Sequence, residues 1–185
     1  MAVVGILALQ GAIEPHIKML EGLGTTCLKI TTPQQLENIE RLLMPGGESS
    51  TMLKLLDKTG LSKAITEFSK TRTVWGICAG AILIAKEVLH PKQNSLGLIN
   101  IRAHRNHYGS QLESFKTKLN ISSLGIEIEA DFIRAPLLEP LDKSVQVLAT
   151  HNQTAVLLKK DNIIASSFHT ELGTNNKLHQ WFLNV

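Results

Sequence analysis

The chain has 185 residues, of which 43% are hydrophobic and 19% are charged, and its net charge is +3 at pH 7. These values are typical of one compact domain with its own core, and they exclude a disordered chain. The positive charge is not concentrated in a run of lysines or arginines, so we expect neither nucleic-acid binding nor membrane binding.

The sequence contains no segment that predicts membrane insertion or secretion. No apolar stretch reaches the roughly 18 residues that a bilayer span needs. The apolar segment 1–10 lacks a basic region and a cleavage site, so it indicates a buried strand rather than a signal peptide. Two cysteines, Cys27 and Cys78, cannot form a disulfide framework. We therefore expect a reducing, cytoplasmic location.

Strand and helix patterns alternate in the first half of the chain. Short apolar runs predict strands at 3–9, 26–30, 41–44 and 73–77. Helices are predicted at 13–22, from a Thr32 cap onward, at 51–56, at 61–70, and from Cys78 to about Lys86. This alternation predicts an α/β fold with a doubly wound, mainly parallel sheet.

The second half of the chain has strand patterns with little helix between them. Strands are predicted at 98–102, 126–133, 145–149, 155–158 and 163–167, and a closing helix at 177–183. We interpret these strands as a mixed or antiparallel extension of the sheet. Three unusual segments, 46–50, Cys78 and 169–171, follow predicted strands. Ligand and catalytic sites of open α/β sheets gather at the carboxyl ends of strands.

Cys78 lies between Gly76 and Gly80 in the pattern G-x-C-x-G, after a predicted strand and before a predicted helix. A nucleophile elbow needs small flanking residues because its central residue has a strained backbone. The alternative is a small buried hydrophobic residue, which is our interpretation of Cys27. We predict that Cys78 is a nucleophile and that the amide of Ala79 contributes to an oxyanion hole.

His169 is the predicted proton acceptor and donor. It follows an apolar run, and Glu171 stands two residues later. In extended backbone this spacing points both side chains to one side, where the carboxylate can hold the imidazole in the useful tautomer. The alternative is an ordinary surface pair, and no third metal ligand stands at a suitable spacing. Three other histidines are expected at the surface, namely His16, His90 and His179. Three more are undecided, namely His104, His107 and His151.

The segment P-G-G-E-S-S-T at 45–51 follows a short predicted strand. Gly46 and Gly47 let backbone amides approach a ligand closely, but the spacing is not that of a phosphate loop. Gly47 could complete the oxyanion hole, and Glu48 could meet an ammonium group. The alternative is a plain turn with a helix cap at Ser49 or Ser50.

Two arginines stand at predicted loops or strand ends. Arg105 opens R-N-H-Y-G, and Arg134 lies in F-I-R-A-P. Either could bind a carboxylate in bidentate fashion, although a surface arginine is the commoner role.

Seven segments together resemble the glutaminase subunits of pyridoxal 5′-phosphate synthase, a branch of the class I glutamine amidotransferases. They are L-A-L-Q-G-A at 7–12, P-G-G-E-S-S-T at 45–51, W-G-I-C-A-G at 75–80, R-N-H-Y-G-S-Q at 105–111, S-F at 114–115, F-I-R-A-P at 132–136 and S-F-H-T-E-L at 167–172. The elbow and H-x-E alone would indicate only the wider class. The L-Q-G-A, G-G-E-S and F-I-R-A-P segments identify this branch.

The resemblance implies a single domain over 1–185, with a flavodoxin-like three-layer α/β/α sandwich and an antiparallel extension. It implies that Cys78, His169 and Glu171 hydrolyse L-glutamine to L-glutamate and ammonia, without a cofactor or metal. It also implies a hetero-oligomer with the synthase subunit, a β/α barrel that assembles as a ring and takes up the ammonia for vitamin B6 synthesis. The implied glutamine-binding residues are Gly46, Gly47, Glu48, Ser49, Arg105, Ile133 and Arg134.

Three positions depart from the family pattern. Ile77 stands where threonine is common, Ser110 where arginine is common, and Thr170 where proline is common. Three other functions stay open: a glutaminase for imidazole or purine synthesis, a binding protein that reuses the elbow, and a cysteine peptidase. Nothing in the sequence indicates a peptide groove.

Overall fold

The computed structural model describes residues 3–105 and 114–185. Its central sheet has seven strands in the order β10-β11-β12-β4-β3-β1-β2. Five neighbouring strands are parallel, namely β1 (Val3–Leu7), β2 (Thr26–Ile30), β3 (Arg41–Met44), β4 (Thr73–Ile77) and β12 (Ile163–Ser166). At the β12 edge, β11 (Thr154–Lys160) and β10 (Gln146–His151) continue the sheet in antiparallel pairing. The predicted mainly parallel sheet with an antiparallel extension is confirmed.

Side chains along the central strands alternate between two hydrophobic cores, one on each face of the sheet. In β3, Leu42 belongs to one core and Leu43 to the other. In β4, Val74 and Trp75 divide in the same way. A parallel sheet that is apolar on both faces has to be covered on both, which accounts for the three layers.

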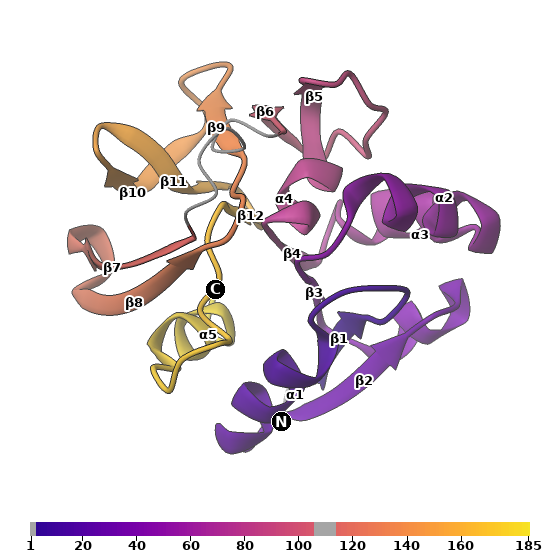
Figure 1. The fold of residues 1–185 in the computed structure, drawn as a ribbon. Coiled ribbons are helices and arrows are strands. Elements are labelled where there is room, and N and C mark those ends of the chain that lie inside the picture. Colours follow the sequence, from indigo (N-terminus) through magenta and orange to yellow (C-terminus); the bar gives the residue numbers. More distant parts are fainter. Residues whose placement is uncertain (1–2, 106–113) are drawn as a thin grey trace.

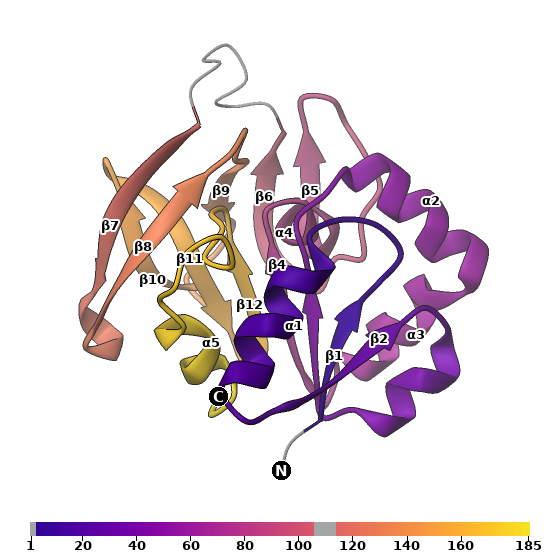
Figure 2. The same ribbon diagram turned by 60° about the horizontal axis from the view of Figure 1, so that its bottom comes forward.

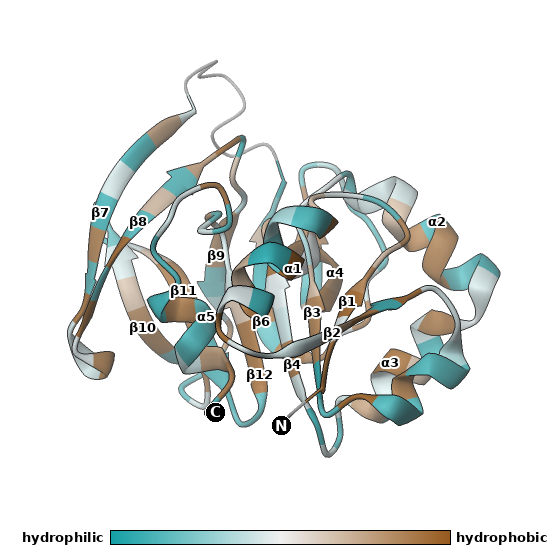
Figure 3. Ribbon diagram, turned by 90° about the horizontal axis from the view of Figure 1, so that it is seen from below, coloured by the Kyte–Doolittle hydropathy of each residue, from teal (hydrophilic) through white to brown (hydrophobic). Residues whose placement is uncertain are grey.

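Helices cover both faces of the sheet (Figure 1). One face carries the 3₁₀ helix η1 (Pro33–Asn38), α2 (Ser49–Thr59), α3 (Leu61–Phe68) and the short, buried α4 (Ala79–Ile84). The other face carries α1 (Ile13–Gly22) and α5 (Lys177–Phe182). Hydrophilic and hydrophobic residues are mixed along α2 and α3, whereas β1 and β3 are hydrophobic (Figure 3). No helix within residues 3–105 or 114–185 has both the length and the apolar composition that crossing a membrane requires.

The second half forms two smaller sheets. One contains β5 (Ala85–Leu89), β6 (Ile99–His104) and β9 (Leu137–Pro140). The other is a hairpin of β7 (Phe115–Ile121) and β8 (Ile126–Phe132), joined through the 3₁₀ turn η2 (Ser122–Leu124). This hairpin lies on the opposite side of the molecule from α2 and α3 (Figure 2).

One predicted element had a wrong end, and three strands were not predicted. The helix after Cys78 ends at Ile84 rather than near Lys86, because β5 begins at the next residue. The strands β5, β7 and β9 were not predicted. β7 exposes alternate polar residues and lacks an apolar run, and β9 ends at a proline, a residue that argues against a strand.

Candidate active site

Cys78 directly follows β4 in a backbone conformation that few non-glycine residues adopt, with φ 51° and ψ −104°. Its N–H donates to the Ser166 carbonyl over 2.8 Å, which joins the turn to β12. A Cβ on Gly76 would lie 2.6 Å from the Gly80 carbonyl oxygen, and one on Gly80 would lie 2.1 Å from that of Met44. Both glycines therefore permit the close packing of this elbow.

His169 and Glu171 lie beside the elbow, just beyond β12. The backbone of His169 pairs in both directions with that of Asp131, over 2.8 and 2.9 Å. Its ring Nδ1 lies 2.5 Å from Glu171 Oε1, and both residues are buried. The other oxygen, Glu171 Oε2, accepts a hydrogen bond from the Thr170 N–H over 3.0 Å. The H-x-E spacing thus places the carboxylate against the imidazole.

Cys78, His169 and Glu171 interact electrostatically as one unit. Burial works against a charged imidazole, but hydrogen bonds to the Cys78 and Glu171 side chains outweigh it and raise the pKa of His169. Burial also works against the carboxylate, but the hydrogen bond from His169 and the nearby His16 lower the pKa of Glu171. The histidine and the carboxylate therefore stabilise each other's charged forms.

A cavity of about 430 Å³ opens in front of Cys78 and the His169 ring. Every predicted site residue except Glu171, which lies behind the ring, lines this cavity: Gly46, Gly47, Glu48, Ser49, Cys78, Ala79, Arg105, Ile133, Arg134 and His169. A larger hollow of about 880 Å³ lies between α1 and residues 171–176. Its lining includes neither Cys78 nor His169, so the smaller cavity is the candidate site.

The glycine loop is in close contact with the imidazole. A Cβ on Gly46 would lie 2.3 Å from His169 Cε1, so a larger residue would displace the ring. The Gly46 carbonyl accepts a hydrogen bond from the Ala12 N–H over 3.0 Å. Because N–H and C=O of a trans peptide point in opposite directions, this bond also fixes the direction of the Gly47 N–H.

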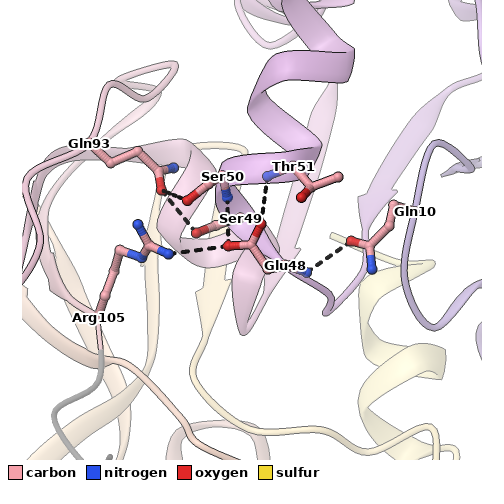
Figure 4. Close-up of polar contacts among 7 residues, drawn as sticks. All are labelled: Gln10, Glu48, Ser49, Ser50, Thr51, Gln93 and Arg105. Carbon is pink, nitrogen blue, oxygen red and sulfur yellow. Dashed lines mark hydrogen bonds and ion pairs between the residues drawn. The ribbon is translucent and has the colours of Figure 1, made fainter.

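Glu48 is the centre of a polar network at one wall of the cavity (Figure 4). Its carboxylate accepts hydrogen bonds from the N–H groups of Ser50 and Thr51, over 3.1 and 2.7 Å, and so caps α2. These bonds, first of all those from Thr51, lower the pKa of Glu48 to about 2. Arg105 Nη2 lies 3.2 Å from the same carboxylate, and Gln10 Oε1 accepts from the Glu48 N–H over 2.9 Å. The helix cap is thus Glu48, not a serine.

Sequence reasoning missed several residues of the site. Gln10, Gly11, Ala12 and Ile82 also line the cavity. The first three follow β1, at the same sheet edge as Cys78. The rule about the carboxyl ends of strands could therefore have indicated them.

The prediction that His16 and His179 lie at the surface was wrong, since both have no exposed area. His16 lies on α1 three residues after Ile13 and four before Leu20, which is on the apolar face of the helix. His179 follows the buried Leu178 on α5. The helical period of the apolar neighbours could have shown this for His16.

Two of the three undecided histidines lie in the described residues, and their surroundings differ. His104 Nε2 lies 2.8 Å from Glu139 Oε2, and the ring of His151 lies 5.5 Å from that of Phe132. Neither lines the cavity. His107 lies outside the described residues.

Two of the positions that depart from the family pattern, and the second cysteine, also lie in the described residues. Ile77 is fully buried in the core beneath α1 and α5, and Thr170 donates its N–H to Glu171. Cys27 is only half-buried in β2, and burial raises the pKa of its thiol to about 11. Ser110 lies outside the described residues.

Comparison with known proteins places the chain in one family. Residues 6–185 match the model of the SNO glutamine amidotransferase family. Pyridoxal 5′-phosphate synthase subunit PdxT of Oenococcus oeni is 40% identical over 98% of this chain and 95% of its own length. The protein of the same name from Desulforamulus reducens is 42% identical over 99% of this chain and 98% of its own. A crystal structure of a glutamine amidotransferase, 38% identical, superposes with a TM-score of 0.92 over 98% of this chain and 97% of that one. The chain is therefore a member of the SNO glutamine amidotransferase family.

Proposed function

We propose that the chain hydrolyses L-glutamine to L-glutamate and ammonia and supplies the ammonia to a synthase subunit that makes pyridoxal 5′-phosphate. The observation that carries this proposal is the elbow of Cys78, which shares one cavity with the imidazole of His169. The imidazole is in turn bound to the buried Glu171 carboxylate. This arrangement suits nucleophilic attack on an amide.

In the proposed reaction Cys78 Sγ attacks the side-chain amide carbon of glutamine, and its proton passes to His169 Nε2. His169 then protonates the amide nitrogen, which leaves as ammonia, and a γ-glutamyl thioester remains on Cys78. Water that gives its proton to His169 hydrolyses the thioester to glutamate and restores the thiol. Glu171 stabilises the imidazolium in both half-reactions.

Two backbone amides are the proposed donors to the oxyanion. The Ala79 N–H belongs to the residue after the nucleophile, which is the usual donor at an elbow. The Gly47 N–H is the second, and in the chain alone the Ala12–Gly46 hydrogen bond holds this peptide in one orientation. The family resemblance implies that the synthase subunit adjusts this loop, so we expect weak hydrolysis by the chain alone.

The polar wall of the cavity offers groups for the amino-acid end of glutamine. Arg105 and Arg134 are cationic partners for its carboxylate. Glu48 is the proposed partner of its ammonium group, and its low pKa keeps it charged at neutral pH. Ser49 and Ile133 complete the proposed binding surface around the reacting amide.

The test measures ammonia release from glutamine by wild type and by Cys78→Ala, each with and without the pyridoxal 5′-phosphate synthase subunit. We expect weak release by the wild type alone and a large increase with the synthase subunit. Cys78→Ala should lose on the order of 1,000-fold or more in rate. A glutamine-analogue diazoketone should attach to Cys78, as located by mass spectrometry.

Cys27→Ser is the matched control, because Cys27 lies away from the cavity and its thiol has a raised pKa. This variant should keep wild-type activity and labelling. Label on another residue, or none with the synthase subunit present, would rule out the proposed nucleophile. Equal rates with and without the synthase subunit would contradict its effect on the oxyanion loop.

A further inference from the structure

Behind Glu171 lies a pair of buried histidines that the proposed reaction does not use. His16 Nδ1, on α1, lies 2.9 Å from His179 Nε2, on α5. The other ring nitrogen of His16, Nε2, lies 3.6 Å from Glu171 Oε2. All three side chains are solvent-inaccessible. The pair therefore connects two helices to the face of the carboxylate that points away from the His169 ring.

Both histidines are neutral at pH 7. Burial lowers the pKa of His16 to about 4 against the opposing attraction of Glu171, and burial lowers that of His179 to about 3. A neutral imidazole carries one N–H, so each ring has two possible tautomers. Since one of the two facing nitrogens has to donate to the other, only two arrangements of the pair satisfy the 2.9 Å contact.

The two arrangements are not equivalent. If His16 Nδ1 donated, the lone pair of His16 Nε2 would face the Glu171 carboxylate. His179 would then carry its proton on Nδ1, an atom with no hydrogen-bond partner among the described residues. If His179 Nε2 donates, the proton of His16 is on Nε2 and faces the carboxylate. In this arrangement the His179 N–H faces an acceptor, and the His16 N–H faces the negatively charged carboxylate.

We infer that His16 and His179 are positioning residues that orient Glu171. His179 Nε2–H donates to His16 Nδ1, and this fixes the His16 proton on Nε2, directed at Glu171 Oε2. At 3.6 Å this last contact is an electrostatic attraction rather than a full hydrogen bond. It adds an N–H dipole without adding a second positive charge beside the carboxylate, so Glu171 stays available to His169.

The surroundings of His179 hold its ring in place. The indole ring of Trp75 lies edge-on to it, with 5.2 Å between ring centroids, and the His16 ring is also 5.2 Å away. The Trp75 indole N–H donates to Ser166 Oγ over 3.0 Å, which ties it to β12. Trp75 therefore connects β12, the strand that precedes His169, with the ring of His179, which sets the tautomer of His16.

The first test observes the tautomers directly. Long-range ¹H–¹⁵N correlation on the full chain with ¹⁵N-labelled histidine distinguishes the two neutral tautomers and the cation. His16→Gln and His179→Gln assign the two signals by their disappearance. We expect both rings at pH 7 to be neutral with the proton on Nε2. A proton on His16 Nδ1, or a positive charge on either ring, would overturn the inference.

The second test measures function and rests on the proposed glutaminase reaction. The rate of Cys78 labelling by the glutamine-analogue diazoketone is followed against reagent concentration, with the synthase subunit present. His16→Leu should lower the maximal rate about 10- to 100-fold, as loss of an orienting group typically does. The half-saturating concentration should not change, because His16 does not line the cavity.

Two conservative variants separate orientation from packing. His16→Gln retains an N–H donor at the reach of Nε2 and should recover most of the lost rate. His179→Phe keeps a ring against Trp75 but removes the donor to His16, and should show a smaller loss than His16→Leu. Thermal unfolding of each variant reports whether it folds. The comparison is restricted to variants that are folded at the assay temperature.

The outcomes distinguish this inference from the proposed function. If the wild type is not labelled at Cys78, the proposed reaction is wrong, and the tautomers still test the histidine pair. If the wild type is labelled but His16→Leu reacts at the same maximal rate, the positioning role is overturned. A loss that His16→Gln does not restore, or one seen only as a change in half-saturation, would also overturn it.

Discussion

The two sides of the His169 ring have opposite character. In front lie the cavity, the Cys78 thiol and the Gly46–Gly47 loop, next to polar groups that are partly exposed, such as Glu48 with half of its side chain accessible. Behind lie Glu171 and the pair of neutral histidines, from which solvent is excluded. The front can exchange partners when a substrate enters, whereas the back has a fixed set of donors.

This difference determines how each side can fail. At the front, water and other polar side chains can replace a lost contact, so shape is the sensitive property. At the back, solvent cannot replace a lost N–H donor. The carboxylate charge would then stay buried with less compensation, which is costly. Substitutions that change the shape in front of the ring should therefore affect different measured properties from substitutions that remove a proton donor behind it.

The largest effect is expected for a change of shape in front of the ring. A Cβ in Gly46→Ala would lie 2.3 Å from His169 Cε1. The ring cannot move back freely, because its Nδ1 is bound to Glu171 over 2.5 Å. Displacement of a catalytic group by about 1 Å costs on the order of 100-fold in rate, and we expect that loss in synthase-stimulated ammonia release.

Gly22→Ala is the control for this change, since a Cβ at the end of α1 would meet nothing within 4 Å. It should leave the rate unchanged. Wild-type activity in Gly46→Ala would show that the imidazole can be relocated without loss. The front of the ring would then not be sensitive to shape.

The same contrast explains what the sequence could predict. The central strands β3 and β4 are buried along almost their whole length, so they appear as short apolar runs, and they were predicted with their observed bounds. The edge strand β2 was also predicted with its bounds, although only Ile30 of it is buried. The hairpin strand β7 is half exposed and reads F-K-T-K-L-N-I, in which only Leu119 and Ile121 are buried. A search for apolar runs misses such a strand, although its alternation of polar and apolar residues is typical of a half-buried strand.

The candidate site follows the same division. The front residues were found because elbows, adjacent glycines and H-x-E are local patterns, and because the resemblance supplied the arginines. His16 and His179 are separated by 163 positions, and no local pattern brings them together. A histidine in a helix is also polar by type, so it was interpreted as a surface residue although α1 turns it inward.

The second prediction concerns stability at the back of the ring. His16 and His179 have pKa values of about 4 and about 3, below the ordinary 6.5. Between pH 6.5 and 4 the unfolded chain therefore binds protons that the folded chain does not. Their contribution to stability is complete above pH 6.5 and is lost as the pH falls. Each histidine adds a slope of about 1.4 kcal/mol per pH unit in the free energy of unfolding.

His179→Gln removes one titrating group but keeps a donor toward His16. The free energy of unfolding, measured by denaturant titration at pH 5, 6 and 7, should therefore depend less steeply on pH in this variant, by up to about 1.4 kcal/mol per unit near pH 5 and by less as the pH approaches 7. The raised pKa of His169 gives a slope of opposite sign as the pH rises toward 7, but this contribution is the same in wild type and variant and cancels from the comparison. Equal slopes in wild type and variant would mean that His179 is protonated in the folded chain.

The smallest effect is expected for the loss of a single donor to Glu171. The Thr170 N–H donates to Glu171 Oε2 over 3.0 Å, and proline, which the family resemblance leads us to expect at this position, has no N–H. Thr170→Pro should lower the maximal labelling rate only about threefold, the equivalent of one net hydrogen bond. The effect is small because His16 still faces the same oxygen.

Thr170→Val is the matched control, because it keeps the N–H and removes only a hydroxyl that has no hydrogen-bond partner among the described residues. It should react like the wild type. In the His16→Leu background, Thr170→Pro should cost more than threefold, since Oε2 then loses both donors and the two losses are coupled. If the two losses instead simply add, His16 and the Thr170 N–H act on the carboxylate independently, and coupling through Oε2 is ruled out.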